Sequence, residues 1–210
     1  MPGSAGFAYV FSIALSPSRP TNIYAATDSG LWSSPDGGST WSNALPSTGG
    51  CYSTVVRGDQ TADIVFATCS QTNGYPLVAL QVEIWSYPPG GNYSIYRGEM
   101  ASGNWQMVFS AANMGSTALA MAPTAPDTIY ALASNSDPTS QFNVALLGLF
   151  ASDQGGTAGT WEQCANTSDT NSITANMLSY PSSPPDCAYG VSGLHTGQGG
   201  WNLALVVASV

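Results

Sequence analysis

Short apolar runs alternate along the chain with turns rich in Pro, Gly, Asp and Ser, and this pattern predicts β-strands. Residues 11–27 read FSIALSPSRPTNIYAAT and residues 117–133 read TALAMAPTAPDTIYALA, so that Pro, Ile and Tyr recur at one constant offset. Each stretch contains an apolar strand, a turn and a second alternating strand. The repetition predicts that one supersecondary unit recurs along the chain.

Two fainter copies of this unit follow the same order of strand and turn. Residues 63–68 (DIVFAT) align with residues 22–27, and residues 185–190 (PDCAYG) align with residues 126–131. The first three copies continue with a third strand, a turn and a fourth strand that opens on a tryptophan. These tryptophans are Trp41, Trp105 and Trp161.

The fourth copy ends on its third strand, within Trp201–Ser209, and lacks a fourth. A four-stranded antiparallel unit with two apolar faces can bury both only by stacking between copies of itself around an axis. The expected fold class is therefore all-β. More narrowly, we expect a β-propeller of four-stranded antiparallel blades, about four in this chain, with the last incomplete.

The turn before the first of these tryptophans carries the most regular motif in the chain, SPDGGSTW over residues 34–41. Asp and Ser side chains accept backbone N–H bonds a few residues on, Gly supplies positive φ, and Trp anchors the next strand. The pattern Ser-x-Asp-x-Gly-x-Thr-Trp resembles the Asp-box (BNR) repeat of the sialidase and xyloglucanase-like β-propellers. Its motif residues are Ser34, Asp36, Gly38, Thr40 and Trp41.

The third copy keeps Ser152, Gly156, Thr160 and Trp161 of the Asp-box motif, with Gln154 in place of Asp and two inserted residues. An amide can accept one of the backbone hydrogen bonds, so we expect the turn to persist in weaker form. The second copy keeps the length of the turn but not its polar residues. The resemblance implies that these turns are structural and lie opposite the substrate face.

The resemblance predicts a single propeller, or a segment of one, over residues 1–210. Its blades are expected at residues 11–45, 51–110, 116–165 and 172–209. The outer strand missing from the last blade comes either from residues 6–10 or from a partner chain; otherwise the chain is part of a larger propeller. An open end exposes a strand edge and an apolar blade face, which predicts homo-oligomers formed through open blade edges.

Charge limits the partners of the chain. It has 12 acidic residues, three arginines and no lysine, a net charge of -9. Binding to nucleic acid or to an anionic membrane surface needs clustered cations, so neither is expected. No apolar run approaches the roughly 20 residues of a membrane span. The first residues also lack the positive region of a signal peptide.

The four cysteines bear on compartment and cofactors. If residues 52–58 and 63–70 form a hairpin, Cys51 and Cys69 lie almost opposite each other, which allows a disulfide. A disulfide favours an extracellular or secreted protein, whereas the alternative is a pair of small buried thiols. No CxxC spacing is present and His195 is the single histidine, so neither a metal site nor a cofactor is expected.

Candidate binding residues lie in the loops that join second to third strands and one unit to the next. Aromatic rings beside amides suit a glycan or polysaccharide, because sugar faces stack on rings and amides bind hydroxyls. Alternatively, the two aromatic candidates, Trp85 and Tyr87, belong to a strand and pack between blades. The candidates are Trp85, Tyr87, Asn135, Gln141 and Asn166.

Two function classes stay open. Sialidases of this fold bind substrate with three arginines on the catalytic face, but the three arginines here map to the other face. Xyloglucan-cleaving relatives use paired acids. The carboxylates on the presumed catalytic face are Asp28, Asp137 and Asp169, and nothing marks two of them as a pair. We therefore expect a non-catalytic extracellular module for binding or assembly. The alternative is a glycoside hydrolase, or a fragment of one, but not a sialidase.

Overall fold

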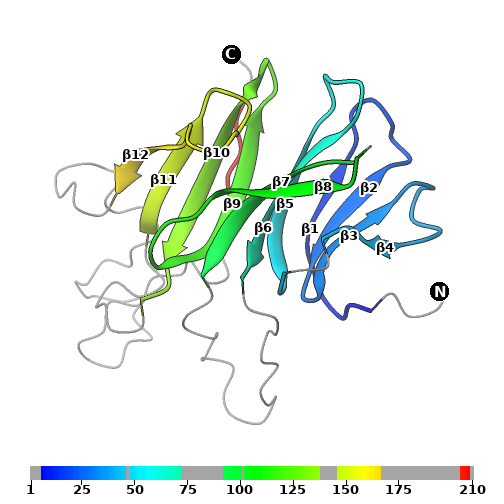
Figure 1. The fold of residues 1–210 in the computed structure, drawn as a ribbon, viewed down its shortest axis with the longest axis horizontal. Helices are drawn as coiled ribbons and strands as arrows, with labels where there is room; N and C mark the ends of the chain where they lie inside the picture. The colour runs from blue at the N-terminus through cyan, green and yellow to red at the C-terminus, as the bar shows by residue number, and fades with distance from the viewer. Residues whose placement is uncertain are drawn as a thin grey trace, which may run out of the picture.

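The computed structural model describes residues 6–45, 48–71, 92–100, 102–137, 146–166 and 204–208. These residues form three antiparallel sheets of four strands each, in chain order, and contain no helix. In Figure 1 the sheets lie in a row, from the blue first sheet on the right to the yellow-green third sheet on the left. The predicted fold class, an all-β propeller of four-stranded antiparallel units, is confirmed for these three units.

Each sheet is a meander in which consecutive strands are neighbours. Sheet 1 contains β1 (Val10–Leu15), β2 (Ile23–Thr27), β3 (Gly30–Ser34) and β4 (Ser42–Asn43). Sheet 2 contains β5 (Cys51–Arg57), β6 (Ile64–Ser70), β7 (Tyr93–Glu99) and β8 (Asn104–Phe109). Sheet 3 contains β9 (Met114–Ala122), β10 (Ala125–Asn135), β11 (Leu146–Ser152) and β12 (Glu162–Asn166).

The predicted fourth unit, residues 172–209, lies outside the described residues except for 204–208. Those five residues form no strand, although the sequence places them in the third strand of that unit.

The sheets stack face to face, and two apolar cores fill the spaces between them. The first strands of the units lie side by side, with β1 against β5 and β5 against β9. β6 is buried along its whole length because its alternate side chains enter different cores. Ile64 and Phe66 pack toward sheet 3, whereas Val65 and Ala67 pack toward sheet 1. Burial on both faces explains why this strand is an almost continuous apolar run.

The strand pairing corrects the alignment of the second copy by one residue. In each sheet an alanine of the second strand pairs with an aromatic residue of the third: Ala25 with Trp32, Ala67 with Tyr96 and Ala131 with Phe150. Counting back from these pairs makes Asp63 equivalent to Thr21 and Asp127, not to Asn22. The backbone carbonyls of all three accept a hydrogen bond from the turn after the third strand. The alignment failed because the first hairpin turn of the second unit is one residue longer.

A disulfide joins Cys51 to Cys69 across β5 and β6, and both residues are fully buried. The two residues are direct antiparallel partners, with Cα atoms 3.9 Å apart. The loop that enters β5 continues this contact, since Gly49 donates to the carbonyl of Ser70. The disulfide therefore fixes the end of sheet 2 opposite the hairpin turn.

The segment before β1 differs from the strand expected over residues 6–10. β1 begins at Val10, and Gly6–Tyr9 forms no strand. The backbone N–H groups of Ala8 and Tyr9 both donate to Asp28 Oδ1 at 3.0 Å. The carbonyl of Tyr9 in turn accepts the N–H of Asp28. Asp28 thus holds the segment against sheet 1 in place of strand pairing.

Candidate functional site

The turn over residues 34–41 is closed by its own side chains. Ser34 Oγ accepts the N–H of Gly38 at 2.8 Å and donates to Asp36 Oδ1 at 2.9 Å. Asp36 accepts the Thr40 N–H at 2.8 Å and the Thr40 hydroxyl at 2.7 Å. Trp41 Nε1 donates to the carbonyl of Gly38 at 3.0 Å. The polar atoms of the motif bind one another, so the Asp36 carboxylate is committed to the turn.

These hydrogen bonds change the acidity of Asp36. The Thr40 hydroxyl and then the Thr40 N–H stabilise the charged carboxylate and, against a smaller effect of desolvation, lower its pKa from 3.8 to about 2. Hydrogen bonds from the Arg57 guanidinium likewise lower the pKa of Asp59 from 3.8 to about 2. A lowered folded-state pKa gives stability that is present above the unfolded pKa and lost as the pH falls through the folded one.

We therefore expect the free energy of unfolding to fall as the pH drops from about 4 to about 2, the interval between these pKa values. Asp36→Asn should reduce that slope, because one of the carboxylates with a lowered pKa no longer titrates. Asp59 and Asp63, whose pKa values are also lowered, should account for much of what remains. Urea denaturation at a series of pH values measures the slope. The exposed Asp153→Asn is the matched control, and equal slopes in Asp36→Asn and the control would contradict this account.

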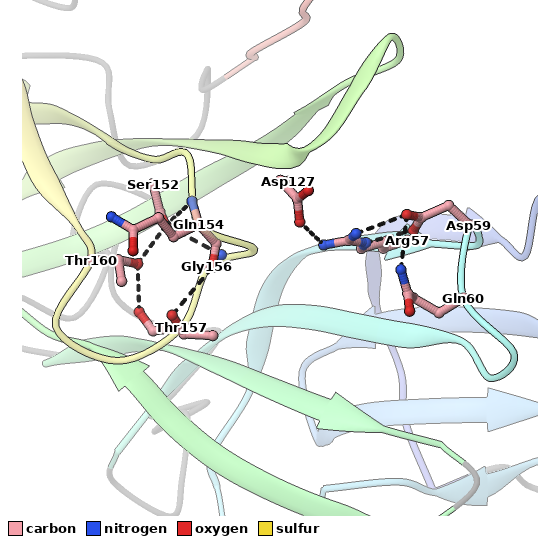
Figure 2. Close-up of polar contacts among 9 residues, drawn as sticks. All are labelled: Arg57, Asp59, Gln60, Asp127, Ser152, Gln154, Gly156, Thr157 and Thr160. Carbon is pink, nitrogen blue, oxygen red and sulfur yellow. Dashed lines mark hydrogen bonds and ion pairs between the residues drawn. The ribbon is translucent and has the colours of Figure 1, made fainter.

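The third turn closes differently from the expectation based on its glutamine. Ser152 Oγ accepts the N–H of Gly156 at 3.2 Å, and the Ser152 and Thr160 hydroxyls share a hydrogen bond of 2.6 Å (Figure 2). The Gln154 amide was expected to accept a backbone N–H, but no hydrogen bond joins its side chain to another described residue. Instead, the hydroxyl groups of Ser152 and Thr160 bind each other directly across a turn that is two residues longer than the first.

This third turn also packs on the neighbouring sheet. Gly156 has φ of 62°, and a Cβ built on it would lie 2.5 Å from Phe66 Cε1 of β6 and 3.1 Å from Ile129. The glycine is therefore required twice, by the left-handed backbone and by the approach of the Phe66 ring. Phe66 and Ile129 are both fully buried. The turn belongs to the interface between sheets 2 and 3.

A buried carboxylate joins sheets 1 and 2 at the same end of the molecule. Asp63 is 1% exposed and accepts hydrogen bonds from Ser16 Oγ at 2.6 Å, Tyr24 OH at 2.8 Å and Asn22 Nδ2 at 3.0 Å. Arg19 adds an ion pair at 3.7 Å. Burial acts to raise the pKa of Asp63, but the hydrogen bonds together outweigh it and hold the pKa below its usual range. Burial and the Asp63 contact both raise the pKa of Tyr24.

Arg57 makes the corresponding connection between sheets 2 and 3. Its guanidinium binds both oxygens of Asp59, with Nε 2.5 Å from Oδ1 and Nη2 2.8 Å from Oδ2. Its Nη1 donates to Asp127 Oδ1, which lies at the start of β10 (Figure 2). The Asp59 contact in particular raises the pKa of Arg57, so the guanidinium stays charged. Two of the three arginines, Arg19 and Arg57, thus hold adjacent hairpins together.

The two connections use equivalent positions. Strand pairing makes Ser16, Arg57 and Ala122 equivalent at the end of the first strand, which we call the donor position. Thr21, Asp63 and Asp127 form the acceptor position before the second strand. Each donor binds the acceptor of the next sheet: Ser16 binds Asp63, and Arg57 binds Asp127. The series stops at both ends. Thr21, at the acceptor position of sheet 1, has no carboxylate, and Ala122, at the donor position of sheet 3, has no side-chain donor.

Two of the three candidate catalytic carboxylates, Asp28 and Asp137, lie within the described residues. Asp28 is engaged with the backbone of Ala8 and Tyr9. Asp137 follows β10, where its N–H donates to Asn135 Oδ1 at 2.9 Å. Asp169 lies outside the described residues. No group of three or more His, Cys, Asp or Glu side chains is placed to hold a metal ion within the described ranges.

The candidate ligand-binding residues are only partly described. Asn135 ends β10 and caps the backbone of Asp137 with its side chain. Asn166 is the last residue of β12. Trp85, Tyr87 and Gln141 lie outside the described residues. Nearby, the carbonyl of Asn113 accepts the N–H of Ser136, so the entry to β9 and the exit from β10 share one end of sheet 3.

One apolar face has no covering sheet among the described residues. The rear face is defined here as the side of sheet 1 that points away from sheet 2, and it carries Ile13, Leu15, Ile23, Ala25, Trp32 and Trp41. Ile13 is 58% exposed and Leu15 is 57% exposed. The opposite side of β1 faces sheet 2, since Ser12 Oγ accepts the N–H of Thr54 in β5.

The rear face has the same composition as a face that is buried elsewhere in the chain. In sheet 3 the equivalent residues are Leu119, Met121, Ile129, Ala131, Phe150 and Trp161. These residues form or pack against the core between sheets 2 and 3, where Leu119 is 5% exposed. The exposed Ile13 is therefore the counterpart of a buried residue. Sequence reasoning anticipated an open blade face in general but not which face it would be.

No helix in the described part of the chain is long and apolar enough to cross a membrane. No family model and no curated protein sequence matches the chain. The GH74 enzyme of Niastella koreensis has a similar structure over 72% of this chain and 22% of its own, with 19% identity and a TM-score of 0.50. At this identity the likeness shows the fold alone.

Two further solved structures have lower scores. YCF48 from Cyanidioschyzon merolae matches over 76% of this chain and 38% of its own, with 15% identity and a TM-score of 0.41. The GH74 xyloglucanase of Xanthomonas campestris matches over 76% and 30%, with 14% identity and a TM-score of 0.32. The chain thus spans between 22% and 38% of the length of these three proteins.

Proposed function

We propose that the chain is a non-catalytic β-propeller module whose role is assembly, and that the rear face of sheet 1 binds a second copy of the chain. The observation that carries the proposal is the equivalence of exposed Ile13 and Leu15 with Leu119 and Met121. Burying such side chains contributes about 1.5–3 kcal/mol each. The rear face has the residue types of a buried face but is exposed, and this combination favours a partner that covers it.

The absence of charge on the rear face allows a second copy to be the partner. The chain carries a net charge of -9, so two copies repel each other unless they meet through a neutral surface. The rear face is such a surface: its residues are uncharged, and its acceptor position holds Thr21 where sheets 2 and 3 hold Asp63 and Asp127. Contact between two rear faces therefore buries no unpaired charge.

An extracellular location belongs to the same proposal. The buried Cys51–Cys69 disulfide supports it, because structural disulfides persist in oxidising compartments.

Light scattering tests the assembly. We expect the purified chain, of 21.6 kDa, to have twice that mass at micromolar concentration. Ile13→Asp should raise the dissociation constant by at least about 100-fold, because like charges facing each other in an interface cost several kcal/mol. Met107→Asp is the matched control, since Met107 is 50% exposed on the outer strand of sheet 2. A chain that stays monomeric, or a dimer that Ile13→Asp leaves intact, would overturn the proposal.

Glycan recognition and glycoside hydrolysis are the second candidate, on the face that carries Asn135 and Asp137. The support for hydrolysis is the fold shared with a GH74 enzyme. Against it, Asp28 is bonded to backbone N–H groups of the N-terminal segment. We expect no release of reducing sugar from xyloglucan or β-glucans. Release that Asp28→Asn, Asp137→Asn or Asp169→Asn abolishes would establish the hydrolase instead. A glycan array tests binding without catalysis.

A further inference from the structure

The first strands of sheets 2 and 3 each bind a hydroxyl group of the sheet before them. The N–H of Thr54 in β5 donates to Ser12 Oγ of β1 at 3.4 Å, and the N–H of Leu119 in β9 donates to Ser53 Oγ of β5 at 3.1 Å. Thr54 and Leu119 are equivalent, because each lies opposite the alanine of the second strand that sets the register. The same backbone group is therefore bound in the same way at both junctions.

A second hydroxyl closes the junction between sheets 2 and 3. Thr68 Oγ1 of β6 donates to the carbonyl of Thr117 in β9 at 2.7 Å and accepts the N–H of Ser53 at 3.1 Å. Thr68 and Thr117 are fully buried, and Ser53 is 8% exposed. The preceding sheet thus supplies polar atoms to the inner edge of a first strand, as expected where backbone groups are buried.

Ile13 is the residue of sheet 1 at this position, since it lies opposite Ala25 of β2. In an antiparallel pair only alternate residues direct their N–H groups toward the partner strand. Ser16, an odd number of residues further on, donates its N–H to the carbonyl of Asn22 on the β2 side. The Ile13 N–H therefore points to the open edge of β1. No side-chain oxygen of a described residue accepts it, in contrast to its two equivalents.

We infer that the Ile13 N–H is a contact point for the second copy, which supplies an uncharged oxygen acceptor in the place that serine Oγ takes at Thr54 and Leu119. This inference rests on the proposed function and names the chemistry that the partner must bring to the rear face. Docking that covered Ile13 without such an oxygen would bury an N–H that has no acceptor, and groups of this kind are rare in folded proteins.

Sheet 3 of the second copy is not suited to supply this oxygen. Its residue equivalent to Ser12 and Ser53 is Ala118, which has no hydroxyl group. Ala118 and Ala120, on the side of sheet 3 that points away from sheet 2, are also only 6% exposed. A head-to-tail contact, with sheet 3 of one copy on the rear face of the next, therefore lacks both the acceptor and an open surface. Contact between two rear faces fits better, and a two-fold axis closes such an assembly at two copies.

Amide hydrogen exchange, followed residue by residue by NMR, tests the inference. Above the dimer dissociation constant the Ile13 amide should exchange at least about tenfold more slowly than below it, because a hydrogen bond forms on association. The amides of Thr54 and Leu119 are internal controls, since they are bonded within one chain and should exchange slowly at both concentrations. Leu15→Asp should return Ile13 to fast exchange at the high concentration, whereas Met107→Asp should not.

The outcomes separate the two claims. If Leu15→Asp breaks the dimer but the Ile13 amide exchanges at one rate in monomer and dimer, this inference is wrong and the assembly proposal stands. If the chain is monomeric at every concentration, both claims are wrong, and slow exchange of Ile13 would then place its acceptor within one chain. Slow exchange of Ile13 in the dimer alone, beside unchanged rates for Thr54 and Leu119, supports the inference.

Discussion

Replacing Asp63 by alanine is expected to lower the free energy of unfolding by about 4 kcal/mol. The carboxylate is 1% exposed and is the acceptor for Ser16 and Tyr24, which are each only 2% exposed. Without it, two buried hydroxyl groups lose their acceptor, at a cost of roughly 1–3 kcal/mol each, and the site loses packed volume. The lost contacts join sheets 1 and 2, so the two sheets should separate more easily.

Urea denaturation of Asp63→Ala, followed by tryptophan fluorescence, measures this effect. Asp153→Ala is the matched control, because Asp153 is exposed in the third turn. Ser16→Ala removes one donor and leaves the carboxylate with Asn22 and Tyr24, so its cost should be only about 1 kcal/mol. If Asp63→Ala and Asp153→Ala unfold at the same urea concentration, Asp63 does not connect the sheets in the way its contacts indicate.

The repeat of Ile and Tyr between residues 11–27 and 117–133 was enough to predict the fold class. Strand periodicity and turn residues are local, and stacking is the only way a sheet with two apolar faces can bury both. The hydrogen bonds that close the first turn could also be predicted from the sequence, because all their donors and acceptors lie within eight residues. Gln154 shows the limit: which side chain closes a turn depends on its length as well as on its residue types.

The connections between sheets could not be predicted from local patterns. Asp63 binds Ser16 from 47 residues away, and Arg57 binds Asp127 from 70 residues away. A one-residue difference in hairpin length hid the equivalence of Asp63 with Asp127. Only the strand register reveals it. Once the register is known, the donor and acceptor positions can be read from the sequence of each unit.

The candidate site shows the same limit. Asp28 was considered as a catalytic carboxylate because of its loop, but two N–H groups from the preceding segment use it as an anchor. The loop position predicts at which end of the sheet Asp28 lies. The hydrogen bonds of its carboxylate depend instead on backbone groups that are distant in sequence, which the loop does not reveal. Ile13 and Leu15 gave no local signal either, since their alternation is that of any half-buried strand. Their exposure became informative only through their counterparts in sheet 3.

Replacing Gly156 by alanine is expected to lower the free energy of unfolding by about 2–5 kcal/mol. An L-residue at a φ of 62° costs roughly 1–2 kcal/mol, and overpacking a core costs typically about 1–3 kcal/mol more. The added Cβ would lie 2.5 Å from the ring of Phe66, which is fully buried between sheets and has no free side toward which to move. The turn or the ring must shift, and either shift opens the core between sheets 2 and 3.

Gly159→Ala separates the two costs within one turn. Gly159 has φ of 83°, and a Cβ built on it meets nothing within 4 Å, so this variant pays only the backbone cost of about 1–2 kcal/mol. Phe66→Leu should recover part of the loss in Gly156→Ala, because the smaller side chain relieves the contact. Calorimetric unfolding of the single and double variants gives the coupling energy. Equal losses in Gly156→Ala and Gly159→Ala would mean that the turn does not press on the neighbouring sheet.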